Sequence, residues 1–308
     1  MTLSFGPGAL RVVLAVLVVI SHLTELEIGR PAVFVFFMLS GYWVSAVYRT
    51  TYRGVILSFY LARFLRVWLP FAAAFLLALA CYAAAGIPKP PATWTGLALF
   101  GIASTRADAL SISWSLDIEL QFYLLVPLIV ALLPWRKSMV AATMALTLAG
   151  WFLLMRYDIW TVFAYLPPFI AGAYLPRFSG RAALSGLIAF ALIGAFVAAV
   201  PYLRPLLQKD VMGPFHPDWF GLPWVLALIP FVGWNVRQQS GWLDRHAGNF
   251  AYALYITHWP VVVLSRHWAS DAWLALSIPF VALTFYILVD RTCERLRQRI
   301  IGGRYRAP

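Results

Sequence analysis

Two ionisable residues share one face of the first apolar run of the chain. Arg11 and His22 flank the stretch VVLAVLVVIS. Eleven steps of 100° return to nearly the same face of an α-helix, with the two side chains about 16 Å apart along its axis. Ionisable residues inside a membrane helix are costly and by default indicate function. A neutral imidazole there can act as a general base, whereas the alternative for His22 is an interfacial histidine anchored by water.

Two carboxylates open the apolar run 113–133, in the segment WSLDIELQFY that begins at Trp114. Asp117 fits a structural role, because a carboxylate near a helix start meets orphan amides and the helix dipole. Glu119 lies deeper on another face, and a buried carboxylate needs a partner. His22 at similar depth is the candidate partner. Glu119 would fix the imidazole tautomer and stabilise the imidazolium, as in hydrolytic triads but without a protein nucleophile.

Two arginines at i and i+3 lie at the inner mouth of the third apolar run. Arg63 and Arg66 share a helical face, and their planar forks suit bidentate phosphate binding. With Arg49 and Arg53 they would place four cations at one cytoplasmic mouth. The alternative is ordinary orienting charge, but a phosphate-rich ligand such as a coenzyme A thioester would make the pair functional.

A second histidine lies in the segment AYALYITHWP, which ends at Pro260. His258 falls mid-span, where an ionisable group is costly, although a packing hydrogen bond from a neutral imidazole explains it equally well. Polar groups that could steady a developing oxyanion are weaker candidates; they are Ser115, Tyr123, Tyr255 and His258. No HExxH, CxxC, P-loop or GxSxG pattern occurs in the sequence, so we expect no metal site.

The elements that must position these residues are membrane helices. Only 12% of residues are charged and the mean hydropathy is +0.78, which predicts an all-α integral membrane protein. Apolar runs long enough to span a bilayer number about ten. They cover 8–23, 31–48, 65–85, 113–133, 138–155, 159–176, 184–201, 219–235, 249–268 and 272–290. The first lacks the features of a signal peptide and is expected to be retained, and 93–103 is too short to cross.

Loop charges support this topology. With both termini in the cytoplasm, about two thirds of the 24 Lys and Arg residues fall on the inner side, as the positive-inside rule requires. This orientation puts Arg11 toward the cytosol and His22 toward the outer face. The helices would enclose a polar cavity or tunnel between them. The net charge of +12 is explained by orientation and anionic lipid, so no nucleic-acid partner is expected.

Taken together, these segments resemble the acyltransferase-3 family of integral membrane acyltransferases. The resemblance rests on six elements in order along the chain. They are Arg11 with His22, the aromatic stretch Phe34–Tyr42, Arg63 with Arg66, the WSLxxExxFY segment Trp114–Tyr123, Phe169 with Gly172, and Ala251–Pro260. Two positions depart from the family pattern. Ala32-Val33 stands where an acidic residue is usual, and Tyr165-Leu-Pro-Pro168 where an arginine is expected.

The resemblance implies a single transmembrane acyltransferase domain over 1–308, without the periplasmic SGNH-type domain of longer relatives. It also implies a multi-pass protein of the bacterial inner membrane. The expected reaction is O-acyl transfer, commonly O-acetyl transfer, from cytosolic acetyl-CoA to a sugar hydroxyl at the outer face. Acetyl-CoA would be a co-substrate rather than a bound cofactor. Membrane lipid, the glycan acceptor and polysaccharide-assembly proteins would be the partners.

The roles implied are His22 and Glu119 as catalytic groups and Arg63, Arg66 and Arg11 as donor-binding groups. Arg11 also fits a structural counter-ion. A polytopic transporter of a small solute or lipid-linked sugar is the rival, because buried charges suit it too; it predicts broken helices in two corresponding halves, which the sequence does not show. A scaffold within a polysaccharide machine would tolerate His22→Ala.

Overall fold

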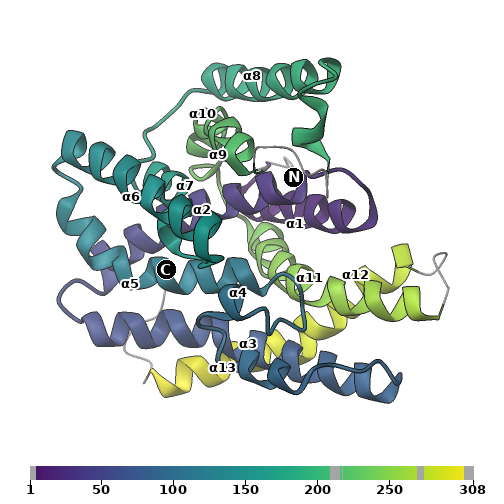
Figure 1. Ribbon diagram of the computed structural model, residues 1–308. Helices are drawn as coiled ribbons and strands as arrows, with labels where there is room; N and C mark the ends of the chain where they lie inside the picture. Colours follow the sequence, from purple (N-terminus) through teal and green to yellow (C-terminus); the bar gives the residue numbers. More distant parts are fainter. Residues whose placement is uncertain (1–4, 209–215, 217, 269–273, 302–308) are drawn as a thin grey trace. The chain divides into compact units, whose positions relative to one another are not determined.

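The computed structural model describes residues 5–208, 216, 218–268 and 274–301. These residues form helices and connecting loops, with no β-strand among them (Figure 1). The chain divides into two compact units. Unit 1 comprises Met1–Trp43 and Tyr165–Tyr252, and unit 2 comprises Val44–Ala164 and Ala253–Pro308.

Five helices in the described part of the chain are long and apolar enough to cross a membrane. They are α2 (Gly29–Thr51), α3 (Ile56–Ala84), α5 (Ser113–Leu132), α6 (Arg136–Tyr157) and α8 (Gly180–Ala199). The shorter helix α1 (Pro7–Leu23) is also apolar. The all-α membrane class is therefore supported, whereas the number of ten spans, the cavity and the orientation of the termini stay predictions.

Several predicted spans differ from the helices that form. The third helix begins at Ile56, nine residues before the predicted start, so Arg63 and Arg66 lie inside it. The run 159–176 contains a 3₁₀ turn, η2 (Val162–Tyr165), and an eight-residue helix, α7 (Leu166–Ala173). Prolines explain such breaks, because proline favours the first turn of a helix and disrupts an interior.

The run 219–235 is likewise divided, into α9 (Asp218–Leu226) and α10 (Ile229–Asn235). Pro230 stands at the start of α10. The last predicted run, 272–290, corresponds to α12 (Leu274–Phe285) and a π-helical turn, η5 (Tyr286–Asp290). The C-terminal helix α13 (Arg291–Ile300) continues from that turn.

In unit 1, two glycines bring α2 and α7 into close contact. A Cβ on Gly41 would lie 2.1 Å from the carbonyl oxygen of Phe169, and a Cβ on Gly172 would lie 2.0 Å from that of Met38. The rings of Phe37 and Phe169 stack at 4.5 Å. The Phe169-x-x-Gly172 element and the Ser-Gly-aromatic element therefore pack against each other.

Unit 1 also contains the side chain that caps the start of α1. Asp244 lies in the first turn of α11 (Trp242–His267) and accepts hydrogen bonds from the amides of Gly8 at 3.1 Å and Ala9 at 2.9 Å. A Cβ on Gly8 would meet the Asp244 carbonyl oxygen at 1.7 Å. Asp244 thus caps α1 from a helix more than 230 residues away in sequence.

In unit 2, α3 contacts both α5 and α13. The hydroxyl of Tyr60 on α3 donates to the carbonyl of Leu124 on α5 at 3.0 Å. This bond sets the level at which the two helices meet. Arg63, one turn further along α3, interacts electrostatically with Tyr123 of α5.

Candidate active site

A polar stripe runs along one face of α5. Ser115, Glu119 and Tyr123 succeed one another at intervals of four residues, which places them on one helical face over about 12 Å. The Tyr123 hydroxyl donates to Glu119 Oε1 at 2.7 Å. Glu119 is half-buried, whereas Ser115 and Tyr123 are buried. We call Ser115, Glu119 and Tyr123 the α5 stripe.

One end of the stripe meets α11. The hydroxyls of Ser115 and Tyr255 are 2.7 Å apart, and both lie near the carbonyl of Ile112. His258, one turn further along α11, is fully buried. Its Nδ1 lies 2.8 Å from the carbonyl oxygen of Tyr255 and 3.2 Å from that of Leu254.

Carbonyl oxygens only accept hydrogen bonds, so Nδ1 of His258 carries the proton when the ring is neutral. Its Nε2 is then the basic nitrogen. The predicted oxyanion candidates Ser115, Tyr255 and His258 thus form one local group, held by main-chain carbonyls.

The other end of the stripe meets α3. Arg63 interacts electrostatically with Tyr123 and Tyr52, and also with Arg66 and Arg297. Tyr123 therefore bonds Glu119 and lies within electrostatic range of Arg63. The sequence predicted these arginines at the inner mouth of the third helix, with the apolar run starting at residue 65. The helix itself starts earlier, at Ile56, so Arg63 lies seven residues into it, and the placement at the membrane mouth stays a prediction.

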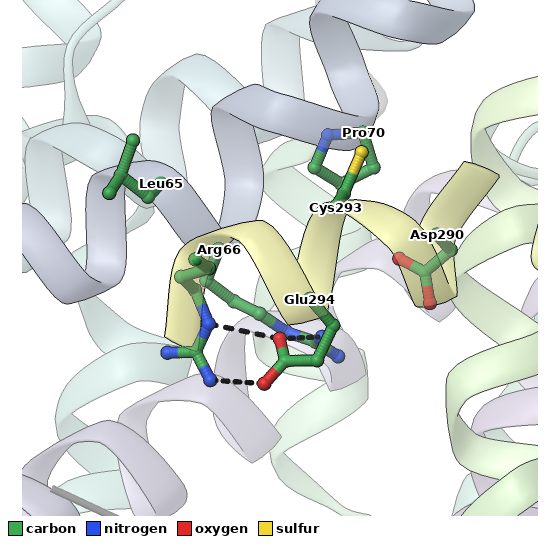
Figure 2. A pocket seen from close by; sticks show the side chains of 7 residues that line it. Leu65, Arg66, Pro70, Asp290, Cys293 and Glu294 are labelled. Carbon is green, nitrogen blue, oxygen red and sulfur yellow. Dashed lines mark hydrogen bonds and ion pairs between the residues drawn. The ribbon is translucent and has the colours of Figure 1, made fainter. Parts of the chain in front are cut away.

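Arg66 is already paired. Its Nη1 lies 3.1 Å from Oε2 of Glu294 on α13, and Figure 2 shows this ion pair beside Asp290 and Cys293. The residues line a small pocket together with Leu65, Pro70 and Arg297. Arg66, one of the two predicted phosphate-binding residues, thus lines the pocket and forms an ion pair with the carboxylate of Glu294.

Asp117 has a structural role, as expected, but at a different helix. It is the fifth residue of α5 and is fully buried. Its two oxygens accept the amides of Gly101 at 3.0 Å and Ala103 at 3.1 Å, and Gln121 donates to it at 3.0 Å. Asp117 therefore caps the short helix α4 (Ile102–Thr105) rather than its own helix.

Arg11 and His22 belong to unit 1, whereas the α5 stripe belongs to unit 2. His22 is half-buried in the last turn of α1. Arg11 interacts electrostatically with Asp244, and its Nη1 would lie 3.6 Å from a Cβ on Gly248. Arg11 is thereby a counter-ion to the carboxylate that caps α1, which matches the structural alternative for this residue.

A buried charge cluster in unit 1 was missed from the sequence. Arg30 pairs with Asp218, and the Tyr165 hydroxyl donates to the same carboxylate oxygen at 3.2 Å. His216 accepts the Asp218 amide on Nδ1 at 3.3 Å, and burial lowers the pKa of this histidine. The departure at Tyr165 therefore has a structural consequence, because Tyr165 joins this network. The only sequence signal was an aspartate opening an apolar run.

The comparisons with known proteins agree with this set of elements. No curated protein and no solved structure matches the chain. The model of the acyltransferase domain that defines the acyltransferase-3 family matches residues 6–289, which is nearly the whole chain. The protein therefore belongs to the acyltransferase-3 family of membrane acyltransferases.

Proposed function

We propose that the protein is an O-acetyltransferase of the bacterial inner membrane. It moves the acetyl group of cytosolic acetyl-CoA to a sugar hydroxyl of a polysaccharide or lipid-linked glycan at the outer face. The observation that carries the proposal is the α5 stripe, because it joins the carboxylate of Glu119 through Tyr123 to the neighbourhood of Arg63. A phosphate-binding group and an acid–base group on one continuous polar path suit a donor that has a phosphate-rich end and a reactive thioester end.

The donor binds through its phosphates. Arg63 and Arg66 are one turn apart on α3 and supply planar guanidinium groups for bidentate contacts. The pantetheine arm then follows the α5 stripe toward Glu119. Arg11, the third residue expected to bind donor, has no part in this path, since its charge is used against Asp244.

The chemistry is a direct transfer with His22 as general base. His22 removes the proton of the acceptor hydroxyl as that oxygen attacks the thioester carbonyl carbon. The carbon–sulfur bond of the tetrahedral intermediate breaks, and the coenzyme thiolate takes the proton from His22. Glu119 orients the imidazole and stabilises its charged form. The hydroxyl pair of Ser115 and Tyr255 supplies donors for the oxyanion.

The acceptor and its supply define the partners. A sugar hydroxyl at the outer face is delivered by polysaccharide-assembly proteins or on a lipid carrier, and membrane lipid surrounds the helices. Family membership does not favour the transporter alternative. A transporter also needs no path from Arg63 to Glu119.

The test uses purified protein in liposomes with labelled acetyl-CoA and candidate glycans. The expected result is label on the glycan, with release of coenzyme A in equal amount. A protein that transfers no label but moves a solute across the liposome membrane would refute the enzymatic proposal.

A further inference from the structure

The C-terminal helix brings a third arginine to the α3 pair. Helix α13 packs along α3, and Arg297 on it is half-buried. Arg63 experiences the charges of both Arg66 and Arg297. We call Arg63, Arg66 and Arg297 the arginine cluster. The three like charges repel one another, so the cluster favours a neighbouring anion.

Glu294 supplies such an anion from within the chain. Its Oε2 lies 3.1 Å from Arg66 Nη1 and 2.9 Å from Arg297 Nε, and its Oε1 lies 2.5 Å from Arg297 Nη2. Gln298 also donates to Oε1, at 2.9 Å. Figure 2 shows the Glu294 carboxylate beside Arg66. Glu294 thus forms hydrogen bonds with guanidinium groups of both α3 and α13.

The cluster still has unused capacity. The Nε of Arg63 is buried and has no hydrogen-bond acceptor among the described residues. Asp290 lines the pocket together with Glu294, Arg66 and Arg297, and Arg63 adds a third guanidinium charge within electrostatic range of the two arginines. A phosphate ester brings up to three acceptor oxygens and as many as two negative charges, more than a carboxylate offers.

We propose that α13 completes the phosphate site for the donor, with Arg297 as a third phosphate ligand and Glu294 as an internal competitor. The phosphate displaces the carboxylate of Glu294 from Arg66 and Arg297 and engages Arg63 as well. This inference rests on the proposed function, because that function supplies the phosphate-bearing donor. Both α13 residues lie beyond the part of the chain that matches the family.

The ionisation of Glu294 agrees with a competitor role. Burial alone would raise the pKa of its carboxyl group, but the hydrogen bond from Arg297 and the charge of Arg66 outweigh burial and hold the pKa below its ordinary value. The carboxylate therefore stays charged at neutral pH. It competes as an anion under the conditions in which the donor binds.

The test measures binding of coenzyme A to the full chain in nanodiscs of neutral phosphatidylcholine. Glu294→Gln removes the competing charge and should lower Kd about 2- to 5-fold, in line with a half-exposed ion pair. Arg297→Gln should raise Kd at least about 5-fold. Arg299→Gln removes the same charge from an exposed position on α13 and should leave Kd unchanged.

Each other outcome has a distinct meaning. If wild type binds coenzyme A but Glu294→Gln does not tighten it, the competitor role is refuted while the proposed function stands. If wild type binds no coenzyme A at all, the donor of the proposed function is refuted. Nanodiscs with phosphatidylglycerol separate the two sources of phosphate. Lipid binding that depends on Glu294 and Arg297, without coenzyme binding, would assign the site to a headgroup and overturn the donor assignment.

Discussion

Replacing Asp117 by Asn should destabilise the protein without impairing the chemistry. The side chain is fully buried and accepts three hydrogen bonds, two of them from main-chain amides at the start of α4. An amide group keeps one acceptor oxygen and turns an NH₂ group toward a donor. One buried N–H loses its acceptor and the remaining bonds lose their charge, which costs about 2–4 kcal/mol.

That cost corresponds to a fall in the unfolding temperature of roughly 3–6 °C for a chain of this size. The assay is thermal unfolding in detergent, together with acetyl transfer per folded molecule at low temperature. Glu119→Gln is the matched control, because it makes the same replacement two residues away. We expect it to keep stability within about 1 kcal/mol and to lose transfer. Unchanged stability of Asp117→Asn, or a lower turnover of its folded fraction, would refute the assignment of Asp117 to the α4 cap.

Three further substitutions test contacts within each unit. Tyr123→Phe removes the hydroxyl that Glu119 accepts and should slow transfer about 5-fold, equivalent to about 1 kcal/mol for a half-buried charge-assisted bond. Tyr60→Phe is the control, because it removes a hydroxyl of α3 that is bonded to a main-chain carbonyl of α5, and it should leave the rate unchanged. Equal losses of rate in both variants would contradict a role for the α5 stripe. Asp244→Asn weakens the cap of α1 and should cost about 1 kcal/mol of unfolding free energy at pH 7. Burial raises the pKa of Asp244, but hydrogen bonds from Ser240 and the α1 amides lower it below 3.8, so this stabilisation is present above that pH and is lost as the pH falls through the depressed value. The difference in unfolding free energy between the two proteins should therefore be smaller at pH 3 than at pH 7, and a constant difference would contradict the cap.

The fold class was readable from the sequence, because runs of apolar residues long enough to span a bilayer report membrane helices directly. Helix limits were less readable. Helix α3 continues nine residues before its apolar run, since a helix can extend past the hydrocarbon region with charged residues on its faces. Prolines in the middle of apolar runs turned two predicted spans into short helices.

The local part of the site was also predictable. Ser115, Glu119 and Tyr123 share a face because of their spacing alone, and the sequence suggested each of them. Pairings between distant segments were not predictable. Arg30 with Asp218, and Arg66 with Glu294, join residues 188 and 228 positions apart. A single sequence gives no signal for such a pair, because each charge also fits a solvated loop or a helix end.

Asp117 shows the limit most clearly. Its position near the start of an apolar helix predicted a structural acid, and the structure confirms a structural contact. The amides that it accepts belong to a four-residue helix, which has no periodicity to recognise.

The central claim is that His22 and Glu119 act together in acetyl transfer. A double-mutant cycle with His22→Ala and Glu119→Gln, measured as initial rates with labelled acetyl-CoA and a glycan acceptor, tests it most directly. Each single variant should lose about 10²-fold or more, and the double variant should be no slower than the slower single variant. A full rate in either single variant, or losses that multiply in the double variant, would contradict the claim.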